Sequence, residues 1–158
     1  RNAIFSLKDS VLRANGKNDT NGDKCAIPNH EYMTGGFSSI YMSRNRVRSW
    51  DQPSFTIQAG GRHAPMHPQA PKMIKHGKND YQYAKGKKRL YRRMSVRECA
   101  RVQGFPDDHI FYYKKVSDGY KTIGNAVPVD FAYILASKIM QDLTDALKVH
   151  AKETHANI

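Results

Sequence analysis

A long amphipathic stretch near the C-terminus constrains the fold most strongly. From Val127 to about Val149, apolar residues recur every three or four positions, a spacing that places them on one side of an α-helix. The stripe consists of Phe131, Ile134, Leu135, Ile139, Leu143, Ala146 and Leu147. Pro128 in the first turn fits a helix start. Such a stripe has to be covered, either by the rest of this chain or by another part of a larger protein.

A capping motif marks a second, shorter helix. In Ser95-Val96-Arg97-Glu98 the serine hydroxyl can accept a hydrogen bond from the amide three residues on, and the glutamate can accept one from the serine amide. The helix then continues through Val102, and Gly104 and Pro106 close it. The apolar spacing from Ala3 to Leu12 predicts a further, weaker helix.

Two β-strands are expected between these helices. Residues 38–50 are rich in Ile, Tyr, Val and Trp, and residues 55–59 follow as a second strand after a turn. Because alternate residues of a strand share a face, three arginines of the first strand would project to one side: Arg44, Arg46 and Arg48. Residues 63–88, rich in Pro, His and Lys, predict an extended surface loop.

The charge balance points to a nucleic-acid partner. The 158 residues carry 26 Lys and Arg against 14 Asp and Glu, a formal net charge of +12. Between residues 44 and 97 the basic side chains number fourteen and the acidic ones two, Asp51 and Asp80. Charge concentrated in one segment favours a surface that binds phosphates, although a basic solvated surface remains the alternative.

The three alternating arginines carry the sharpest chemical prediction. An arginine guanidinium can donate to both O6 and N7 of guanine in the major groove. A fourth arginine, Arg62, follows the glycine pair 60–61 on the adjacent loop. The alternative is that these side chains contact only phosphates. An RNA-binding protein is not supported, because the sequence has no RNP-like aromatic motif and no GXXG loop.

Several other patterns favour structural roles. The stretch 123–128, Ile-Gly-Asn-Ala-Val-Pro, predicts a glycine turn leading into a helix N-terminus, where a ligand could approach free amides. The charges Arg97, Glu98 and Arg101 predict a structural ion network. The seven histidines lack nucleophile partners at a known spacing, and we expect them on the surface or in loops.

The two cysteines, Cys25 and Cys99, exclude a disulfide framework and show no metal-binding spacing, so we expect no metal. No apolar run approaches the length of a membrane span, and no signal-peptide pattern opens the chain. These observations fit a reducing, cytoplasmic compartment.

Two strings resemble conserved motifs of the bacterial DNA cytosine-5 methyltransferases. Residues 91–108, YRRMSVRECARVQGFPDD, resemble motif IX, and residues 119–129, GYKTIGNAVPV, resemble motif X. Residues 40–71 look like the target-recognition domain of that family, including the short signature Thr56-Ile57-x-x-x-Gly61. In detail they are most similar to the HaeIII-type modification methyltransferases of restriction–modification systems, which recognise GGCC.

The resemblance implies an α+β fold in three parts. Residues 1–20 would end the catalytic domain as a linker helix, and 21–118 would form a small, irregular β-rich DNA-recognition domain with the capped helix. Residues 119–158 would contribute the motif X turn and a C-terminal helix to the Rossmann-like α/β domain that binds S-adenosyl-L-methionine. The implied partners are double-stranded DNA with a flipped-out cytosine and the N-terminal catalytic segment, in the same chain or as a second subunit.

The resemblance also implies roles for individual residues. Arg44, Arg46 and Arg62 align with arginines that contact guanines, and Ile40 with a residue placed against the opened bases. Arg48 and Thr56 complete the expected DNA-binding set. The cofactor pocket would be lined by Asn125, Ala126 and Val127. Motif IX would organise the recognition domain.

The motifs that are missing carry a further expectation. The sequence has no FxGxG cofactor loop, no Pro-Cys nucleophile motif, no Glu-Asn-Val motif and no QxRxR motif. Neither Cys25 nor Cys99 lies in the nucleophile's context, so we expect no catalytic residue and no methyl transfer by this chain alone. The first residue is Arg1 rather than Met, and we expect a fragment of a longer enzyme or the smaller subunit of a split one. A free-standing DNA-binding module remains the alternative.

Overall fold

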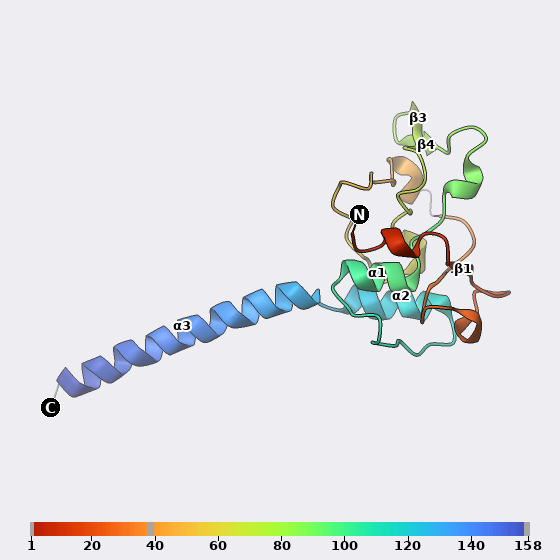
Figure 1. Ribbon diagram of the computed structural model, residues 1–158. Coiled ribbons are helices and arrows are strands. Elements are labelled where there is room, and N and C mark those ends of the chain that lie inside the picture. Colours follow the sequence, from red (N-terminus) through yellow and green to blue (C-terminus); the bar gives the residue numbers. More distant parts are fainter. Residues whose placement is uncertain (1, 38–39, 157–158) are drawn as a thin grey trace. The chain divides into compact units, whose positions relative to one another are not determined.

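The computed structural model describes residues 2–37 and 40–156, which form two compact units, Arg1–Ala126 and Val127–Ile158 (Figure 1). The three functional segments 1–20, 21–118 and 119–158 stay a prediction. Short helices and small sheets together make the α+β fold that was expected. The elements in chain order are η1 (Phe5–Leu7), β1 (Leu12–Arg13), η2 (Gly22–Lys24), β2 (Glu31–Tyr32), η3 (Tyr41–Ser43), η4 (Gly61–His63), β3 (Ile74–Gly77), β4 (Asp80–Gln82), η5 (Lys88–Leu90), α1 (Val96–Val102), α2 (Val116–Asn125) and α3 (Val129–Ala156).

Two small sheets hold segments of the first unit together. β1 and β2 pair in parallel, with Leu12 opposite Glu31, and β3 and β4 form an antiparallel hairpin. The hairpin turns at Asn79, whose φ of 62° lies in the left-handed region that asparagine tolerates better than most residues. The hairpin stands at one end of the unit, and α1 and α2 lie together at the other (Figure 1).

The capping motif forms as predicted. The Ser95 hydroxyl accepts a hydrogen bond from the Glu98 amide at 3.0 Å, and the Glu98 carboxylate accepts one from the Ser95 amide at 2.7 Å. These bonds satisfy two amides that the first turn of a helix leaves unpaired. α1 is therefore fixed at its N-terminus, and it is buried from Val96 through Ala100.

The predicted glycine turn at 123–128 is wrong. Ile123, Gly124 and Asn125 are instead the last residues of α2, a helix that the sequence analysis did not predict. A Cβ on Gly124 would lie 2.3 Å from the backbone N of Ala59 and 2.3 Å from the carbonyl carbon of Gln58. The glycine thus permits a close approach, but the approaching group is the backbone of Gln58 and Ala59 and not a ligand.

Three further predictions of local structure are corrected. Residues 3–12 form a single 3-10 turn and a short strand instead of an α-helix. No strand is found at 55–59, or at the described residues 40–50, and Ser38 and Ser39 lie outside the described residues. The loop predicted at 63–88 contains the β3–β4 hairpin. The paired residues of β1 and β2 are distant in the sequence, and local patterns do not report such pairing. The β3–β4 hairpin, by contrast, is a local pairing that the sequence analysis missed.

Two hydrophobic clusters form the core of the first unit. The first joins α1 and α2 to Ile57 and Phe111. The second lies between the segment 41–47 and the hairpin, and it consists of Tyr41, Val47, Met66, Ala70, Met73 and Tyr91. The predicted DNA-binding residues of the segment 40–48 therefore lie on irregular backbone that packs against the second cluster.

The long C-terminal helix forms as predicted, as α3. Pro128 directly precedes it, and the Pro128 carbonyl accepts the first helical hydrogen bond, from the Ala132 amide at 2.9 Å. Described by itself, this unit is one helix and contains no partner for its stripe, with Phe131 59%, Ile134 66% and Leu143 55% exposed. Among the described residues, no helix is both long and apolar enough to cross a membrane.

Candidate nucleic-acid interface

The segment 40–48 is fixed to the core by alternate residues. The Tyr41 hydroxyl donates a hydrogen bond to the Ala64 carbonyl at 2.8 Å, and Val47 is buried beside it. Between them, the Asn45 side chain accepts from the Met73 amide at 2.9 Å and donates to the Val47 carbonyl at 2.8 Å. Although the segment is no strand, Tyr41, Asn45 and Val47 are directed toward the core. Arg44 and Arg48 are exposed, whereas Arg46 is half-buried.

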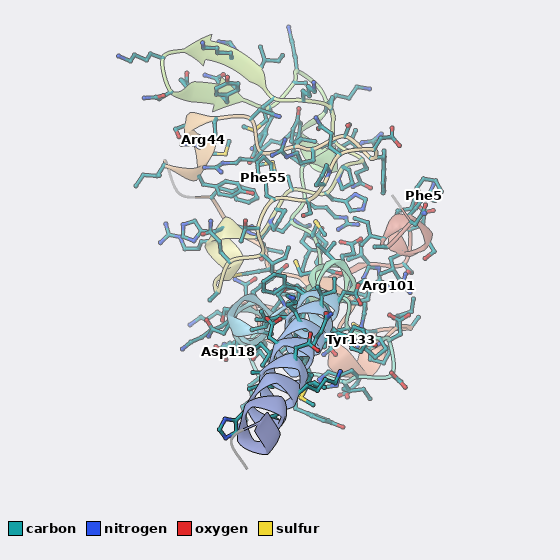
Figure 2. The ribbon with its side chains drawn as sticks, turned by 90° about the vertical axis from the view of Figure 1, so that its left-hand side faces the viewer. Phe5, Arg44, Phe55, Arg101, Asp118 and Tyr133 are labelled. Carbon is teal, nitrogen blue, oxygen red and sulfur yellow. The ribbon has the colours of Figure 1, made fainter. Side chains whose placement is uncertain are left out.

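The three arginines differ in what already holds them. Arg46 donates from Nε to the Tyr41 carbonyl at 2.5 Å, and its guanidinium lies 4.4 Å from the centre of the Tyr41 ring. Arg48 lies 4.2 Å from the centre of the Phe55 ring. Arg44 is exposed on extended backbone and makes no hydrogen bond or ion pair with any described residue. Arg44 directly follows η3, near the hairpin (Figure 2).

A second segment, residues 55–62, carries the other two predicted polar DNA-binding residues, Thr56 and Arg62, and both are exposed. Arg62 lies in η4, directly after the buried Gly61. A Cβ at Gly61 would meet the Met33 sulfur at 2.8 Å and the Tyr120 ring at 2.9 Å, so the backbone packs closely there. Ile40, from the first segment, is 80% exposed. All six predicted DNA-binding residues thus belong to the first unit, and only Arg46 is braced by backbone carbonyls.

Arg93 joins the loop at residues 33–37 to Gly61, a role the sequence analysis missed. Its guanidinium donates to four carbonyls, at 2.6 Å to Gly61 and at 2.8–3.2 Å to Gly36, Gly35 and Met33. It also lies 4.0 Å from the centre of the Phe37 ring, and that ring stacks on Tyr41 at 4.8 Å. Burial lowers the pKa of Arg93, but a guanidinium stays charged. The only signal in the sequence was its place in motif IX.

A buried polar cluster lies beneath α1. Arg92 donates to both Glu98 oxygens, at 2.7 and 2.8 Å, and His67 Nε2 lies 3.4 Å from Glu98. His30 contacts the Ser95 hydroxyl at 2.8 Å. His30 and His67 lie in loops, as predicted, but both are fully buried, which the sequence analysis did not predict. Burial lowers the pKa of both, His67 to about 4, while Arg92 holds the pKa of Glu98 below its usual value.

This cluster predicts a loss of stability in acid. His67 stays neutral in the folded chain down to a pKa of about 4, whereas it takes up a proton near pH 6.5 when unfolded. The contribution of His67 to the free energy of unfolding, up to about 3 kcal/mol, is therefore complete above pH 6.5 and is lost as the pH falls toward 4. Urea unfolding at pH 7.5, 6 and 4.5 measures this. In His67→Gln the free energy of unfolding should depend less on pH. An unchanged dependence on pH in that variant would show that His67 is not the group responsible.

The predicted charges of α1 have structural contacts, but Arg97, Glu98 and Arg101 do not form one ion network. The buried Arg97 donates to the carbonyls of Pro28, Pro106 and His109 at 2.8 Å each. Arg101 pairs with Asp107 and also donates to the Ala3 carbonyl at 3.1 Å, which ties the N-terminal segment to α1 (Figure 2). These bonds use the charged groups to hold chain segments in place, and they leave none aimed at a substrate.

The predicted cofactor-pocket residues lie where the two units join in sequence. Asn125 ends α2 and is exposed, Ala126 is half-buried, and Val127 begins the second unit. Their side chains carry no charge and no acid or base, and their place in a cofactor pocket stays a prediction.

Neither cysteine has the environment of a nucleophile. Burial raises the pKa of the half-buried Cys25 to about 11, with a further contribution from Glu31. Cys99 is fully buried in α1, and burial raises the pKa of its thiol well above neutrality. Both thiols stay protonated at pH 7, and a protonated thiol is a weak nucleophile. No three His, Cys, Asp or Glu side chains of the described residues gather into a metal-binding group.

Comparison with known proteins gives consistent matches. The family model described as C-5 cytosine-specific DNA methylase matches residues 2–141. The Type II methyltransferase M.FnuDI of Fusobacterium nucleatum is 58% identical over 94% of this chain and 43% of its own length. The Type II methyltransferase M.MthTI of Methanothermobacter thermautotrophicus is 66% identical over 83% of this chain and 40% of its own length. M.NgoPII of Neisseria gonorrhoeae is 55% identical over 90% of this chain and 41% of its own length. The chain spans about two-fifths of the length of these relatives.

Proposed function

The chain belongs to the C-5 cytosine-specific DNA methylase family, and from this premise we propose that it carries the target recognition of a restriction–modification DNA (cytosine-5)-methyltransferase. The partner is double-stranded DNA, and the site is GGCC. The observation that carries the proposal is the pair of exposed arginines, Arg44 and Arg62, on residues 40–48 and 55–62, which we call the recognition segments. Arg93 holds Gly61 of the second segment and packs on Phe37, whose ring stacks on Tyr41 of the first. Guanine is the base that an arginine fork fits best.

The predicted DNA-binding residues make different contacts. Arg44 and Arg62 are free to donate to guanine O6 and N7, because no group of the described chain occupies their guanidinium groups. Arg46 holds the carbonyls of the η3 turn and presents its remaining donors to the same edge. Arg48 stacks on Phe55 beside Thr56, where both can contact the backbone or a base edge. The exposed Ile40 packs against bases opened by the flipped cytosine.

Methyl transfer itself requires groups that these residues do not supply. When bound, S-adenosyl-L-methionine supplies the methyl group, and Asn125, Ala126 and Val127 would form one wall of its pocket. The nucleophilic cysteine belongs to the catalytic segment that this chain's longer relatives carry in addition, because Cys25 and Cys99 are protonated. The apolar stripe of α3 fits the same view, since a one-helix unit needs a partner surface.

The proposal predicts a change of specificity from a single substitution. Arg44→Ala should weaken binding to a GGCC duplex by about 1–3 kcal/mol and relax discrimination at one guanine. Competition binding against duplexes with one base pair changed measures both effects. Lys121→Ala, which removes an exposed charge on α2, serves as the matched control. Equal weakening on every sequence would mean that Arg44 contacts a phosphate, and the readout by Arg44 would fail.

A further inference from the structure

A second basic surface lies behind the recognition segments, in a cavity of about 450 Å³. We call it the basic–aromatic groove. Its lining residues are Arg13, Tyr32, Met33, Thr34, Gly35, Phe37, Tyr83, Lys88, Arg89, Tyr91, Arg92 and Arg93. All of them belong to the first unit. The volume falls within the usual range for small-molecule and cofactor sites.

The groove carries five cations and no carboxylate in its lining. Three of these cations, Arg13, Lys88 and Arg89, are exposed and pair with no acid among the described residues. A concave wall of one charge focuses the electrostatic potential and concentrates ligands of the opposite charge. The rim therefore favours an anion.

The floor of the groove contains an unsatisfied donor. Arg92 is 94% buried and donates its two terminal nitrogens to Glu98, but its Nε has no hydrogen-bond acceptor among the described residues. A buried donor left without an acceptor costs about 1–3 kcal/mol. Nε itself is not exposed to the groove, so this donor belongs to the interior of the chain and the rim cations are left to hold an anion.

Aromatic rings supply flat faces beside these cations. The Tyr83 and Tyr91 rings lie 4.5 Å apart, with an interplanar angle of 31°. On the other wall, Arg93 lies over Phe37 at 4.0 Å and Arg92 over Tyr32 at 5.7 Å. Aromatic faces next to basic side chains are the arrangement on which unpaired nucleotides stack, at about 1–3 kcal/mol per base.

The groove adjoins the recognition segments. Phe37, one of its walls, stacks on Tyr41 at the start of η3, and Arg93 in its floor holds the carbonyl before Arg62. We propose that the groove binds one nucleotide of the DNA outside the recognised bases, with its phosphate at the rim of Arg13, Lys88 and Arg89 and its base against the tyrosines. This inference rests on the proposed function for the source of the nucleotide, and the chemistry of the groove requires only a phosphate joined to a planar ring.

The test distinguishes binding in the groove from nonspecific attraction of an anion by positive charge elsewhere on the chain. The probes are deoxycytidine monophosphate, deoxycytidine and inorganic phosphate, with binding followed by amide chemical shifts of the purified chain. We expect the monophosphate to shift groove residues and to bind about tenfold more tightly than either half. The double variant Lys88→Ala, Arg89→Ala should lose about tenfold. The control Lys75→Ala, Lys78→Ala removes the same charge from the exposed hairpin, which does not line the groove, and it should change binding less than about twofold.

Duplex binding by the same variants identifies the source of the nucleotide. If the DNA supplies it, the groove variant weakens binding to all duplexes by a similar factor and leaves the preference for GGCC intact. Loss of the preference in Arg44→Ala would then be a separate result, so the two proposals can fail independently. Equal effects of the two double variants would overturn the groove as a site. Binding of the monophosphate with no change in duplex affinity would overturn the DNA as its source.

Discussion

Replacing Glu98 with Ala should destabilise the chain by about 3–5 kcal/mol, because it leaves the charge of Arg92 buried without a partner. Arg92 is 6% exposed, and both of its terminal nitrogens donate to Glu98. The same substitution removes half of the capping box, since the Ser95 amide also loses its acceptor. The free energy of unfolding, from urea denaturation followed by circular dichroism, measures the loss.

An exposed ion pair of the same chain provides the matched control. Arg101 and Asp107 pair at 2.5 Å with side chains 21% and 44% exposed, and water compensates much of what such a pair gains. Asp107→Ala should therefore cost less than about 1 kcal/mol. Glu98→Gln keeps a similar shape and an acceptor for Ser95, and it should fall between the two. Similar losses in Glu98→Ala and Asp107→Ala would show that the buried pair contributes no more than a surface one.

Replacing Gly124 with Ala should also be strongly destabilising, although alanine is the better helix former. Alanine gains about 1 kcal/mol over glycine inside a helix. Against this, the new Cβ would lie 2.3 Å from backbone atoms of Gln58 and Ala59, which cannot rotate away as a side chain can. Overpacking costs about 1–3 kcal/mol, and more where backbone must move, so the steric cost prevails.

The same substitution reaches the recognition surface. Gln58 and Ala59 lie between Thr56 and Arg62, so a displaced backbone should weaken duplex binding as well as stability. Thr122→Ala, at an exposed position of the same helix, controls for helix propensity and should change stability by only a few tenths of a kcal/mol. Stabilisation by Gly124→Ala would show that α2 and the recognition segment do not pack as closely as described.

The sequence predicted those elements that are defined by interactions between residues close together in the sequence. The capping box of α1 uses residues three positions apart, and the stripe of α3 repeats every turn, so both can be recognised without a structure. By contrast, α2 contains Gly119 and Gly124, both poor helix formers. Packing against Tyr113 and against Gln58–Ala59 explains both, and those partners are not recognisable beforehand.

The candidate site was predicted in part for the same reason. The exposure of Arg44 and Arg48 agrees with the predicted alternation, but Arg46 is half-buried against Tyr41. The roles of His30 and Arg93 were missed, because their partners are far away in the sequence. His30 contacts Ser95 across 65 positions, and Arg93 donates to carbonyls 32 to 60 positions away. Such contacts are set by the tertiary fold and leave no local pattern.

The central claim is that this chain selects the DNA sequence. The most direct measurement is selection of duplexes by the purified chain from a pool with random central sequence, followed by sequencing of the bound fraction. We expect enrichment of one short motif, GGCC, over the starting pool, and we expect the Arg44→Ala variant to lose its preference for one of the two guanines. Binding that depends on salt but enriches no sequence would contradict the account, because the arginines would then contact phosphates alone.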